Sequence, residues 1–350
     1  MKIINKKIKI DAAGALTGAV REYIRANGLI KPGDKILIGV SGGPDSAALL
    51  DILFTLRHEL GAEIAVAHFN HGLRRGAKAD ENFTRALAAR YNLKFFAGAW
   101  GNGAKKPASG IEEKARQARL KFFAQTMKRG GYTKLALAHT QNDVAETFLM
   151  RIIRGSGLKG LQTILPGREL EGMTVIRPLL AVGKPELLAY LRGRGLDYRT
   201  DPTNRQNDFT RNAVRNDLLP RLAKSYNPNI ISVLADASGN MAVDYDFIAA
   251  QAEAVFAKLA QPGKSKGKIA FSLKPFCRQH PAMQKMLLRL ACEKLAGDLN
   301  GLDYRHWKEV EGLITARPNE SIVNLPRSLK VRKTAASLVL EKHSMSSRTN

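Results

Sequence analysis

The residues best suited to bind an anion form a short loop, Ser41–Ser46, with the sequence SGGPDS. Its two glycines let the backbone approach a phosphate and direct N–H groups at the oxygens, as at other anion-binding helix N-termini. The two serines add hydroxyl donors, and Pro44 suits the first turn of a helix, where a missing N–H has no consequence. The loop therefore predicts a phosphate site, with an ordinary glycine-rich turn and a serine cap as the alternative.

An acid within this loop, Asp45, sets it apart from the common phosphate loops. A Walker A loop would need GxxxxGK[ST] and a Rossmann loop GxGxxG, and the segment matches neither. It has no lysine to reach a γ-phosphate, whereas a carboxylate beside phosphates can help to hold Mg²⁺. These features fit chemistry in which pyrophosphate leaves as a unit and AMP is transferred.

A second polar stretch, AHTQNDVAET, begins at Ala138 directly after the apolar run KLALA. His139 is expected at the end of a strand. Asp143 and Glu146 are three residues apart and therefore lie on one face of the helix that follows. Such a pair could bind a cation, or it could only stabilise the start of the helix through the dipole. The residues alone leave both interpretations open.

Arginines gather in two further segments. The amphipathic helix expected over Ile111–Phe123 places Arg116 and Arg119 on neighbouring turns. They could meet phosphate, or they could lie on a solvated face that carries ion pairs such as Glu112 with Arg116. The segment Arg151–Gly160 is a basic helix end followed by a glycine loop, which suits RNA phosphates.

The chain as a whole is strongly basic, because 56 lysines and arginines against 31 acidic residues give a net charge of +25. A charge of this size is best offset by a polyanion, which favours nucleic acid as the partner. The two cysteines, Cys277 and Cys292, exclude a disulfide scaffold. The sequence has no apolar run long enough to span a membrane and no signal-peptide pattern. We therefore expect a cytoplasmic protein with no membrane partner.

Apolar runs alternate with amphipathic stretches in the first part of the chain, which is typical of an α/β fold with a parallel sheet between helices on both faces. The expected strands are Lys35–Val40, Glu63–Phe69, Lys94–Ala97 and Lys134–Ala138. The expected helices are Pro44–Glu59, Lys78–Tyr91, Ser109–Arg129 and Gln141–Arg154. Ligands of such sheets bind at the carboxyl ends of the strands, where the polar motifs fall.

Helical patterns dominate after the alternation ends. They cover Ile230–Ala260, Pro281–Leu295 and Tyr304–Thr315, and two short strands are expected at Ser321–Leu325 and Ser337–Glu341. We predict an N-terminal domain over residues 1–222 and a smaller, basic, mostly helical domain over residues 223–350 that binds nucleic acid.

The loop SGGPDS resembles the pyrophosphate-binding loop of the N-type ATP pyrophosphatases, the PP-loop superfamily, whose sheet is of the HUP type. Within that superfamily, further motifs resemble those of the tRNA(Ile)-lysidine synthetases. They are HFNHGLR, IEEKARQARLKFF, HTQNDVAET, IRPLL, DPTN and RNAVRNDLLP, in this order along the chain. The residues that differ from the usual family pattern are Leu120, Thr140, Asn142 and Val144.

The resemblance implies a ligase that uses ATP and Mg²⁺ to adenylate the wobble cytidine of tRNA(Ile) with the anticodon CAU. Free L-lysine then displaces AMP at C2, which makes lysidine and changes codon reading from AUG to AUA. The expected partners are therefore this tRNA, ATP and lysine, and the sequence allows a homodimer.

The resemblance also implies roles for individual residues. ATP is expected to contact Ser41, Gly42, Gly43, Pro44, Asp45, Ser46, Ala67 and His139. Catalysis is expected from Asp45, Asp143, Arg116 and Arg211, with Asp45 and Asp143 also holding Mg²⁺. Lysine is expected to bind Asp143 and Glu146. The residues expected to contact tRNA are His71, Arg74, Arg119, Arg151, Arg154 and Arg215.

Two other functions are compatible with parts of the sequence. A 2-thiocytidine tRNA synthetase would share the loop but usually carries CxxC motifs, which this chain lacks. A non-catalytic RNA-binding module could keep the sheet, but it would have no need for Asp45, Asp143 and Glu146. Pyrophosphate release on addition of ATP and tRNA distinguishes an enzyme from such a module.

Overall fold

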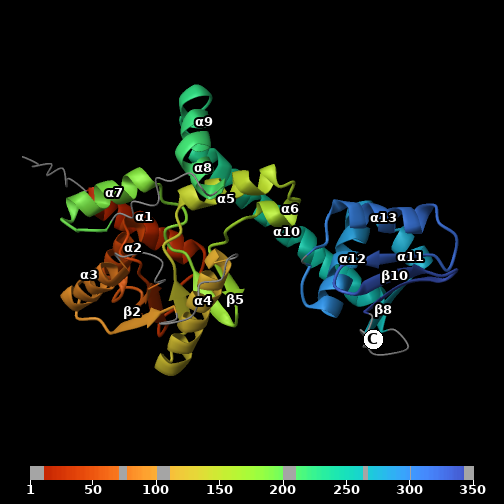
Figure 1. Ribbon diagram of the computed structural model, residues 1–350, viewed down its shortest axis with the longest axis horizontal. Helices are drawn as coiled ribbons and strands as arrows, with labels where there is room; N and C mark the ends of the chain where they lie inside the picture. The colour runs from red at the N-terminus through yellow and green to blue at the C-terminus, as the bar shows by residue number, and fades with distance from the viewer. Residues whose placement is uncertain are drawn as a thin grey trace, which may run out of the picture. The chain divides into compact units, whose positions relative to one another are not determined.

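The computed structural model describes residues 12–70, 77–100, 111–199, 210–262, 267–299 and 301–342 (Figure 1). The chain divides into two compact units, residues 1–242 and 243–350. Helix α10 (Ile230–Leu259) runs through the position at which the units divide. The boundary expected between residues 222 and 223 stays a prediction. Within the described ranges, no helix is both long and apolar enough to cross a bilayer.

A six-stranded sheet forms the centre of the first unit, with the strand order β3-β2-β1-β4-β6-β5. Neighbouring strands pair in parallel except at the edge, where β5 is antiparallel to β6. The strands are β1 (Lys35–Gly39), β2 (Glu63–Asn70), β3 (Phe95–Ala99), β4 (Lys134–Ala136), β5 (Gly167–Leu170) and β6 (Met173–Ile176). The predicted parallel α/β sheet is confirmed, and the four expected strands are present with slightly different ends.

Helices cover both faces of this sheet because its strands are apolar on both sides. On one face, Ile36 and Ile38 belong to a core shared with α1, α2 and α7. On the other face, Leu37 belongs to a core shared with Phe123 and Met127 of α4. The helical elements are α1 (Ala12–Ala26), α2 (Pro44–Leu56), α3 (Ala77–Arg90), α4 (Ile111–Gly130), α5 (Gln141–Ile153), α6 (Leu158–Leu161), α7 (Lys184–Gly193), α8 (Thr210–Ala213), the π-helical turn η2 (Val214–Leu218), α9 (Leu219–Ser225) and α10.

The hairpin of β5 and β6 and the first helix, α1, are absent from the sequence-based expectations. The hairpin extends the sheet beyond β4. Its turn contains Glu171 and Gly172, whose φ angles are 50° and 71°. Both strands have only four residues. Periodicity cannot identify so short a strand, which explains why the sequence did not predict this hairpin.

The second unit is not mostly helical, so that part of the fold prediction is wrong. It contains a five-stranded antiparallel sheet in the order β7-β8-β11-β10-β9, against which helices pack (Figure 1). Its strands are β7 (Ala260–Pro262), β8 (Lys268–Ser272), β9 (Ile322–Leu325), β10 (Leu329–Lys333) and β11 (Ser337–Lys342). Its further helices are α11 (Leu273–Cys277), α12 (Pro281–Ala296) and α13 (Tyr304–Thr315). Leu329 and Val331 are buried while Lys330 is not, and this alternation was the available sequence signal.

A buried carboxylate joins α2, the end of α3 and α7 in the first unit. Asp51 of α2 is 1% exposed and accepts a hydrogen bond from the Tyr91 hydroxyl at 2.6 Å. It also accepts hydrogen bonds from the Tyr190 hydroxyl and from Nε of Arg194, the latter at 3.0 Å. Burial acts to raise the pKa of Asp51, but these hydrogen bonds hold that pKa below its usual range.

Replacing Asp51 with asparagine is expected to lower the free energy of unfolding by about 1–3 kcal/mol, because three donors lose a charged acceptor. The folded-state pKa lies below that of the unfolded chain. The stabilisation is therefore complete above the unfolded pKa and is lost as the pH falls through the folded value. Urea unfolding at neutral and acid pH measures both effects. Asp197→Asn, at an exposed position, is the matched control, and an equal loss in the control would contradict this account.

Candidate active site

The candidate site lies at the point where the sheet order reverses. β1 has β2 on one side and β4 on the other. The chain adds β2 and β3 on one side of β1, and then adds β4, β5 and β6 on the other side. In open α/β sheets, ligands bind at such a switch point, outside the carboxyl ends of the strands. The loop Ser41–Ser46 follows β1, and the stretch from His139 to Glu146 follows β4. The two main motifs of the sequence are therefore neighbours in the fold.

The loop after β1 is stabilised by its own hydrogen bonds. The Ser46 hydroxyl donates to the Gly43 carbonyl at 2.9 Å and accepts from the Ser41 N–H at 3.2 Å. Helix α2 begins at Pro44, and Gly43 caps it without a side-chain hydrogen bond. The N–H groups at the start of a helix have no partner inside the helix, so they can bind an anion here.

Gly42 is the residue of this loop whose backbone requires glycine. Its φ angle is +90°, a conformation that other residues rarely adopt. The Arg199 N–H donates to the Gly42 carbonyl at 2.9 Å, and Nε of Arg199 lies 3.0 Å from Oδ1 of Asp80. A Cβ atom at Gly42 would lie 3.5 Å from atoms of both Phe83 and Thr84. Contacts from distant parts of the chain thus fix the loop.

Gly42→Ala is expected to lower the free energy of unfolding by about 1–3 kcal/mol, because alanine is strained at this φ angle. Gly43→Ala is the matched control, since Gly43 has φ of −72° and its Cβ would meet only the Ser41 hydroxyl, at 3.4 Å. Urea unfolding of the two variants measures the difference. Equal stability of both variants would mean that the loop relaxes without cost.

Asp45, in the first turn of α2, has a buried Oδ1 with no hydrogen-bond partner among the described residues. Burial raises the pKa of Asp45. The nearby charges of Lys184 and Arg215 oppose this rise, and those of Asp143 and Glu146 add to it. A buried carboxylate oxygen without a donor is unfavourable unless a ligand supplies the missing partner.

Asp143 both caps α5 and faces an arginine. Its Oδ2 accepts hydrogen bonds from the N–H of Thr140 at 2.8 Å and from the hydroxyl of Thr140 at 3.0 Å. Its Oδ1 accepts a hydrogen bond from Nη2 of Arg211 at 2.8 Å. Helix capping therefore occupies Oδ2, whereas Oδ1 faces Arg211.

Glu146, one turn further along α5, is 1% exposed and is held by two arginines. Arg215 donates from Nε to Oε1 at 2.6 Å and from Nη2 to Oε2 at 2.8 Å. Arg211 adds a hydrogen bond from Nε to Oε2 at 2.8 Å. Such a two-pronged arginine–carboxylate pair is among the stronger hydrogen-bonded contacts in proteins.

Arg215 lies in the π-helical turn η2, directly before α9 and Pro220. Proline removes a backbone donor and clashes with the preceding helical turn, so a regular α-helix is disfavoured at this position. Single π-helical turns occur frequently at functional sites. Val214 and Leu219 pack with Ala145 of α5, which holds this turn against the helix that carries the carboxylates.

The structure therefore brings together residues to which the sequence gave separate roles. Arg211 was expected near phosphate and Arg215 near tRNA, and both contact the carboxylates of α5. Asp143 and Glu146, the expected lysine ligands, already accept hydrogen bonds from these arginines. The roles of these two acids and two arginines toward lysine, Mg²⁺, phosphate and tRNA stay predictions.

His139, after β4, lies among cations. Its Nδ1 is buried and has no hydrogen-bond partner in the described part of the chain. Burial lowers the pKa of His139 to about 4; Asp143 opposes this, whereas Arg177, Arg211 and Arg119 act in the same direction. The imidazole is therefore neutral at pH 7, and one of its nitrogens can accept a hydrogen bond.

The remaining predicted residues are more scattered. Ala67 is buried in β2, where its carbonyl accepts the N–H of Val40 at 2.9 Å. Arg116 is exposed on α4, and Arg151 and Arg154 are exposed at the end of α5. Two expected tRNA contacts lie outside the described residues: His71 and Arg74.

Three residues near the site were not singled out as site residues from the sequence. Lys184 is the first residue of α7, and its charge acts to lower the pKa of Asp45. Arg199 donates a backbone hydrogen bond to Gly42. The charge of Arg177 acts to lower the pKa of His139. Arg177 is the arginine of the IRPLL motif, so a signal was available for it. Lys184 and Arg199 stand in segments with no strong motif of their own.

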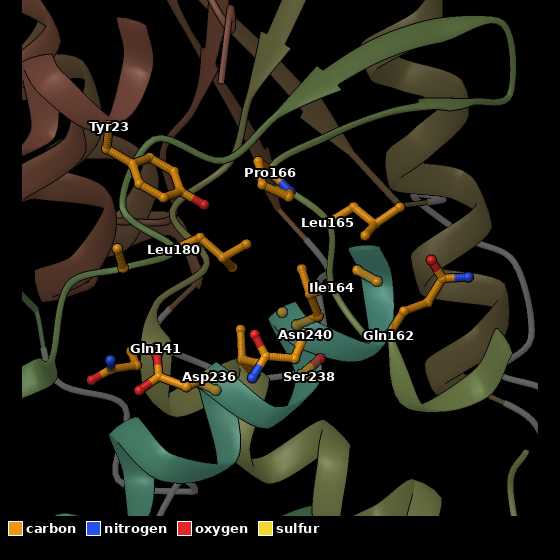
Figure 2. A pocket seen from close by; sticks show the side chains of 15 residues that line it. Tyr23, Gln141, Gln162, Ile164, Leu165, Pro166, Leu180, Asp236, Ser238 and Asn240 are labelled. Atoms are coloured by element: carbon orange, nitrogen blue, oxygen red, sulfur yellow. The ribbon is translucent and has the colours of Figure 1, made fainter. Parts of the chain in front are cut away.

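A hollow of about 360 Å³ lies within the first unit, beside the start of α5. Figure 2 shows Tyr23 of α1 and Gln141 of α5 at its rim together with Asp236, Ser238 and Asn240 of α10. The residues that the sequence assigned to ATP, lysine or tRNA are absent from its lining. The lining of this hollow therefore does not include Asp45, Asp143 or Glu146.

A family model of the PP-loop domain matches residues 17–222. A tRNA(Ile)-lysidine synthase from Clostridioides difficile (strain 630) is 34% identical over 324 residues, which cover 92% of this chain and 69% of the relative. The chain belongs to the tRNA(Ile)-lysidine synthase family. A tRNA(Ile)-lysidine synthase from Geobacter sulfurreducens is also 34% identical, over 330 residues that cover 93% of this chain and 69% of the relative.

A solved structure outside the tRNA(Ile)-lysidine synthases supports the fold. The U34-tRNA thiolase NcsA from Methanococcus maripaludis, solved with its 4Fe-4S cluster, aligns with a TM-score of 0.55 at 16% identity. The alignment covers 65% of this chain and 79% of the thiolase. At this identity the likeness shows a shared fold alone. The two cysteines of this tRNA(Ile)-lysidine synthase family member, Cys277 and Cys292, are free and lie in the second unit.

Proposed function

We propose that this member of the tRNA(Ile)-lysidine synthase family makes lysidine in tRNA(Ile) with a CAU anticodon, in two steps. In the first step, O2 of the wobble cytidine attacks the α-phosphorus of ATP, and pyrophosphate leaves. In the second step, an amine of L-lysine attacks C2 and loses a proton, and AMP leaves with the former O2. The product changes codon reading from AUG to AUA.

The observation that carries this proposal is the buried, unpartnered Oδ1 of Asp45 next to the loop Ser41–Ser46. The N–H groups at the start of α2 suit the pyrophosphate of ATP. A carboxylate at the same place would repel those phosphates unless a cation lay between them. The arrangement therefore supports ATP bound together with a divalent cation, rather than a bare phosphate site.

The residues present fit Mg²⁺ in the mode that this ion usually adopts. It keeps several waters and binds one or two carboxylates together with substrate phosphates. Asp45 and Asp143 would supply the carboxylates. Within the described ranges no group of three or more His, Cys, Asp or Glu side chains could hold a metal, so phosphates would have to complete the shell. When bound, the ion would neutralise charge that develops on the phosphates.

Lysine recognition is proposed for Asp143 and Glu146, because carboxylates hold an ammonium group by charge-assisted hydrogen bonds. The side chain of Asp143 is 16% exposed and that of Glu146 is 2% exposed, so Asp143 is the more accessible partner. Arg211, whose side chain is 41% exposed, bridges the two acids. Lysine would therefore share these acids with Arg211 or displace it, whereas Arg215 would keep Glu146 in place.

Three cations of the first unit are proposed to act on phosphate. Arg116 and Arg211 would stabilise charge on the α-phosphate, and Lys184 would approach the pyrophosphate near Asp45. The proposed tRNA contacts remain His71, Arg74, Arg119, Arg151, Arg154 and Arg215. A homodimer, a cytoplasmic location and tRNA binding by the C-terminal domain also stay predictions of the sequence.

Pyrophosphate release tests this proposal. With ATP and a tRNA(Ile) transcript that carries CAU, release is expected without lysine, because the first step needs no amine. A transcript with uridine in place of the wobble cytidine is the matched control, and we expect release from it to fall by roughly 100-fold or more. Equal release from the two transcripts would contradict adenylation of the wobble cytidine.

A further inference from the structure

We propose that Arg177, together with Arg119 and His139, forms a pocket for a phosphate group of a substrate, beside the acids of α5. This proposal rests on the proposed function for the identity of the phosphate-bearing substrates, which are ATP and tRNA. Arg177 would be the central residue of the pocket, and neither the motifs nor the family relationship assigns it a role.

The first observation is that Arg177 is a buried cation without an anionic partner in the described part of the chain. It directly follows β6 and is 5% exposed. Its Nη1 donates to the carbonyl of Leu165 at 2.7 Å. Its Nε is buried without a hydrogen-bond partner, and within the described residues it forms no ion pair. A buried charge is expensive unless an opposite charge compensates it, so the site is incomplete without an anion.

The second observation is that other cations lie near Arg177, and the acid that acts on His139, Asp143, already accepts a hydrogen bond from Arg211. β4 and β6 are parallel neighbours, so His139 and Arg177 both follow the carboxyl ends of adjacent strands. Arg119 of α4 and Arg177 both act to lower the pKa of His139. The pKa of Arg177 itself is lowered to about 10, by burial first and then by Arg168 and Arg116. These charges repel one another in the chain alone and would be relieved by one shared anion.

The third observation is the donor chemistry of the pocket. Arg177 and Arg119 offer planar guanidinium forks, which match the geometry of phosphate oxygens. His139, neutral at pH 7, can turn one nitrogen to donate and the other to accept. Guanidinium groups match carboxylates as well as phosphates, and we propose phosphate because two substrates of the proposed reaction, ATP and tRNA, carry it. The source is either a phosphate of ATP or the tRNA backbone phosphate next to the modified nucleotide.

Arg177→Met tests the pocket in the full chain, because methionine fills similar space without charge. Arg129→Met is the matched control, since Arg129 is exposed in the last turn of α4, the helix that also carries Arg119. Dissociation constants for tRNA(Ile) without ATP, and for ATP with Mg²⁺ without tRNA, are measured for both variants. Neither measurement needs lysine or turnover, so failure of the proposed reaction would not be mistaken for failure of the pocket.

We expect Arg177→Met to raise one of the two dissociation constants about tenfold or more, as for loss of a charge-assisted hydrogen bond. A rise for tRNA, with a shallower salt dependence, assigns the pocket to the tRNA backbone. A rise for ATP alone assigns it to the nucleotide. Values for both ligands equal to those of Arg129→Met would overturn the proposal.

The melting temperature without ligands separates this role from a purely structural one. An uncompensated buried charge destabilises the empty protein, so Arg177→Met should melt no lower than the wild type. If the only role of Arg177 were its hydrogen bond to the carbonyl of Leu165, the variant would melt several degrees lower and bind both ligands equally weakly. That result would contradict the pocket.

Arg177→Lys keeps the positive charge but lacks the planar guanidinium group, so it should retain intermediate affinity for the same ligand. Wild-type affinity in both variants would also overturn the proposal.

Discussion

Replacing Asp45 with asparagine is expected to slow tRNA-dependent pyrophosphate release by roughly 100-fold to 1000-fold. Asparagine keeps the shape of the side chain but removes the negative charge that would hold Mg²⁺ beside the phosphates of ATP. Oδ1 of Asp45 has no donor among the residues that the structure describes, and burial raises the pKa of Asp45. The substitution should therefore leave the melting temperature unchanged or raise it, which separates a lost ligand from a lost fold.

Single-turnover release of pyrophosphate measures this effect, and circular dichroism measures the melting temperature. Asp197→Asn removes the same charge from an exposed position and should behave as the wild type. Near-normal release by Asp45→Asn at saturating Mg²⁺ would remove Asp45 from the metal site. A large drop in melting temperature would show instead that the carboxylate supports the fold.

Glu146→Gln is expected to raise the KM for lysine about tenfold or more, while lysine-independent adenylation of tRNA survives. Glutamine keeps the size of the side chain but cannot offer a charged acceptor to an ammonium group or to Arg215. Asp143→Asn is the comparison, because Asp143 is proposed to serve both Mg²⁺ and lysine and should impair both steps. The lysine KM and the yield of AMP–tRNA without lysine are measured side by side.

Removing one partner of a buried ion pair can cost about 3–5 kcal/mol of stability, so the folding of Glu146→Gln must be checked. Glu146→Asp keeps the charge and provides a second variant if glutamine unfolds the chain. Equal loss of both steps in Glu146→Gln would show that Glu146 holds Arg211 and Arg215 in position rather than binding lysine. An unchanged lysine KM would exclude it from lysine binding.

The sequence predicted the parts of the fold that depend on local patterns. The run KILIGV followed by SGGPDS defines a buried strand, a glycine turn and a helix start within a few residues, and β1 and α2 follow that pattern. Asp143 and Glu146 are three residues apart, so their common face on α5 followed from helix geometry alone.

The parts that could not be predicted depend on contacts between distant residues. No periodicity relates Glu146 to Arg211 and Arg215, which reach it from more than 60 positions away along the chain. That Nε of Arg177 is buried without a hydrogen-bond partner among the described residues likewise becomes visible only when its surroundings are known. In the second unit the expected strands Ser321–Leu325 and Ser337–Glu341 correspond to β9 and β11, but β7, β8 and β10 were not predicted, and three helices separate β8 from β9 along the chain.

The central claim is that the chain joins lysine to the wobble cytidine of tRNA(Ile). The most direct test is mass spectrometry of nucleosides from a CAU-bearing tRNA(Ile) transcript incubated with the full chain, ATP, Mg²⁺ and lysine. The account predicts a nucleoside heavier than cytidine by one lysine less one water, present with wild type and lost in Asp45→Asn. Only unmodified cytidine with the wild type, or a product whose formation does not require lysine, would contradict it.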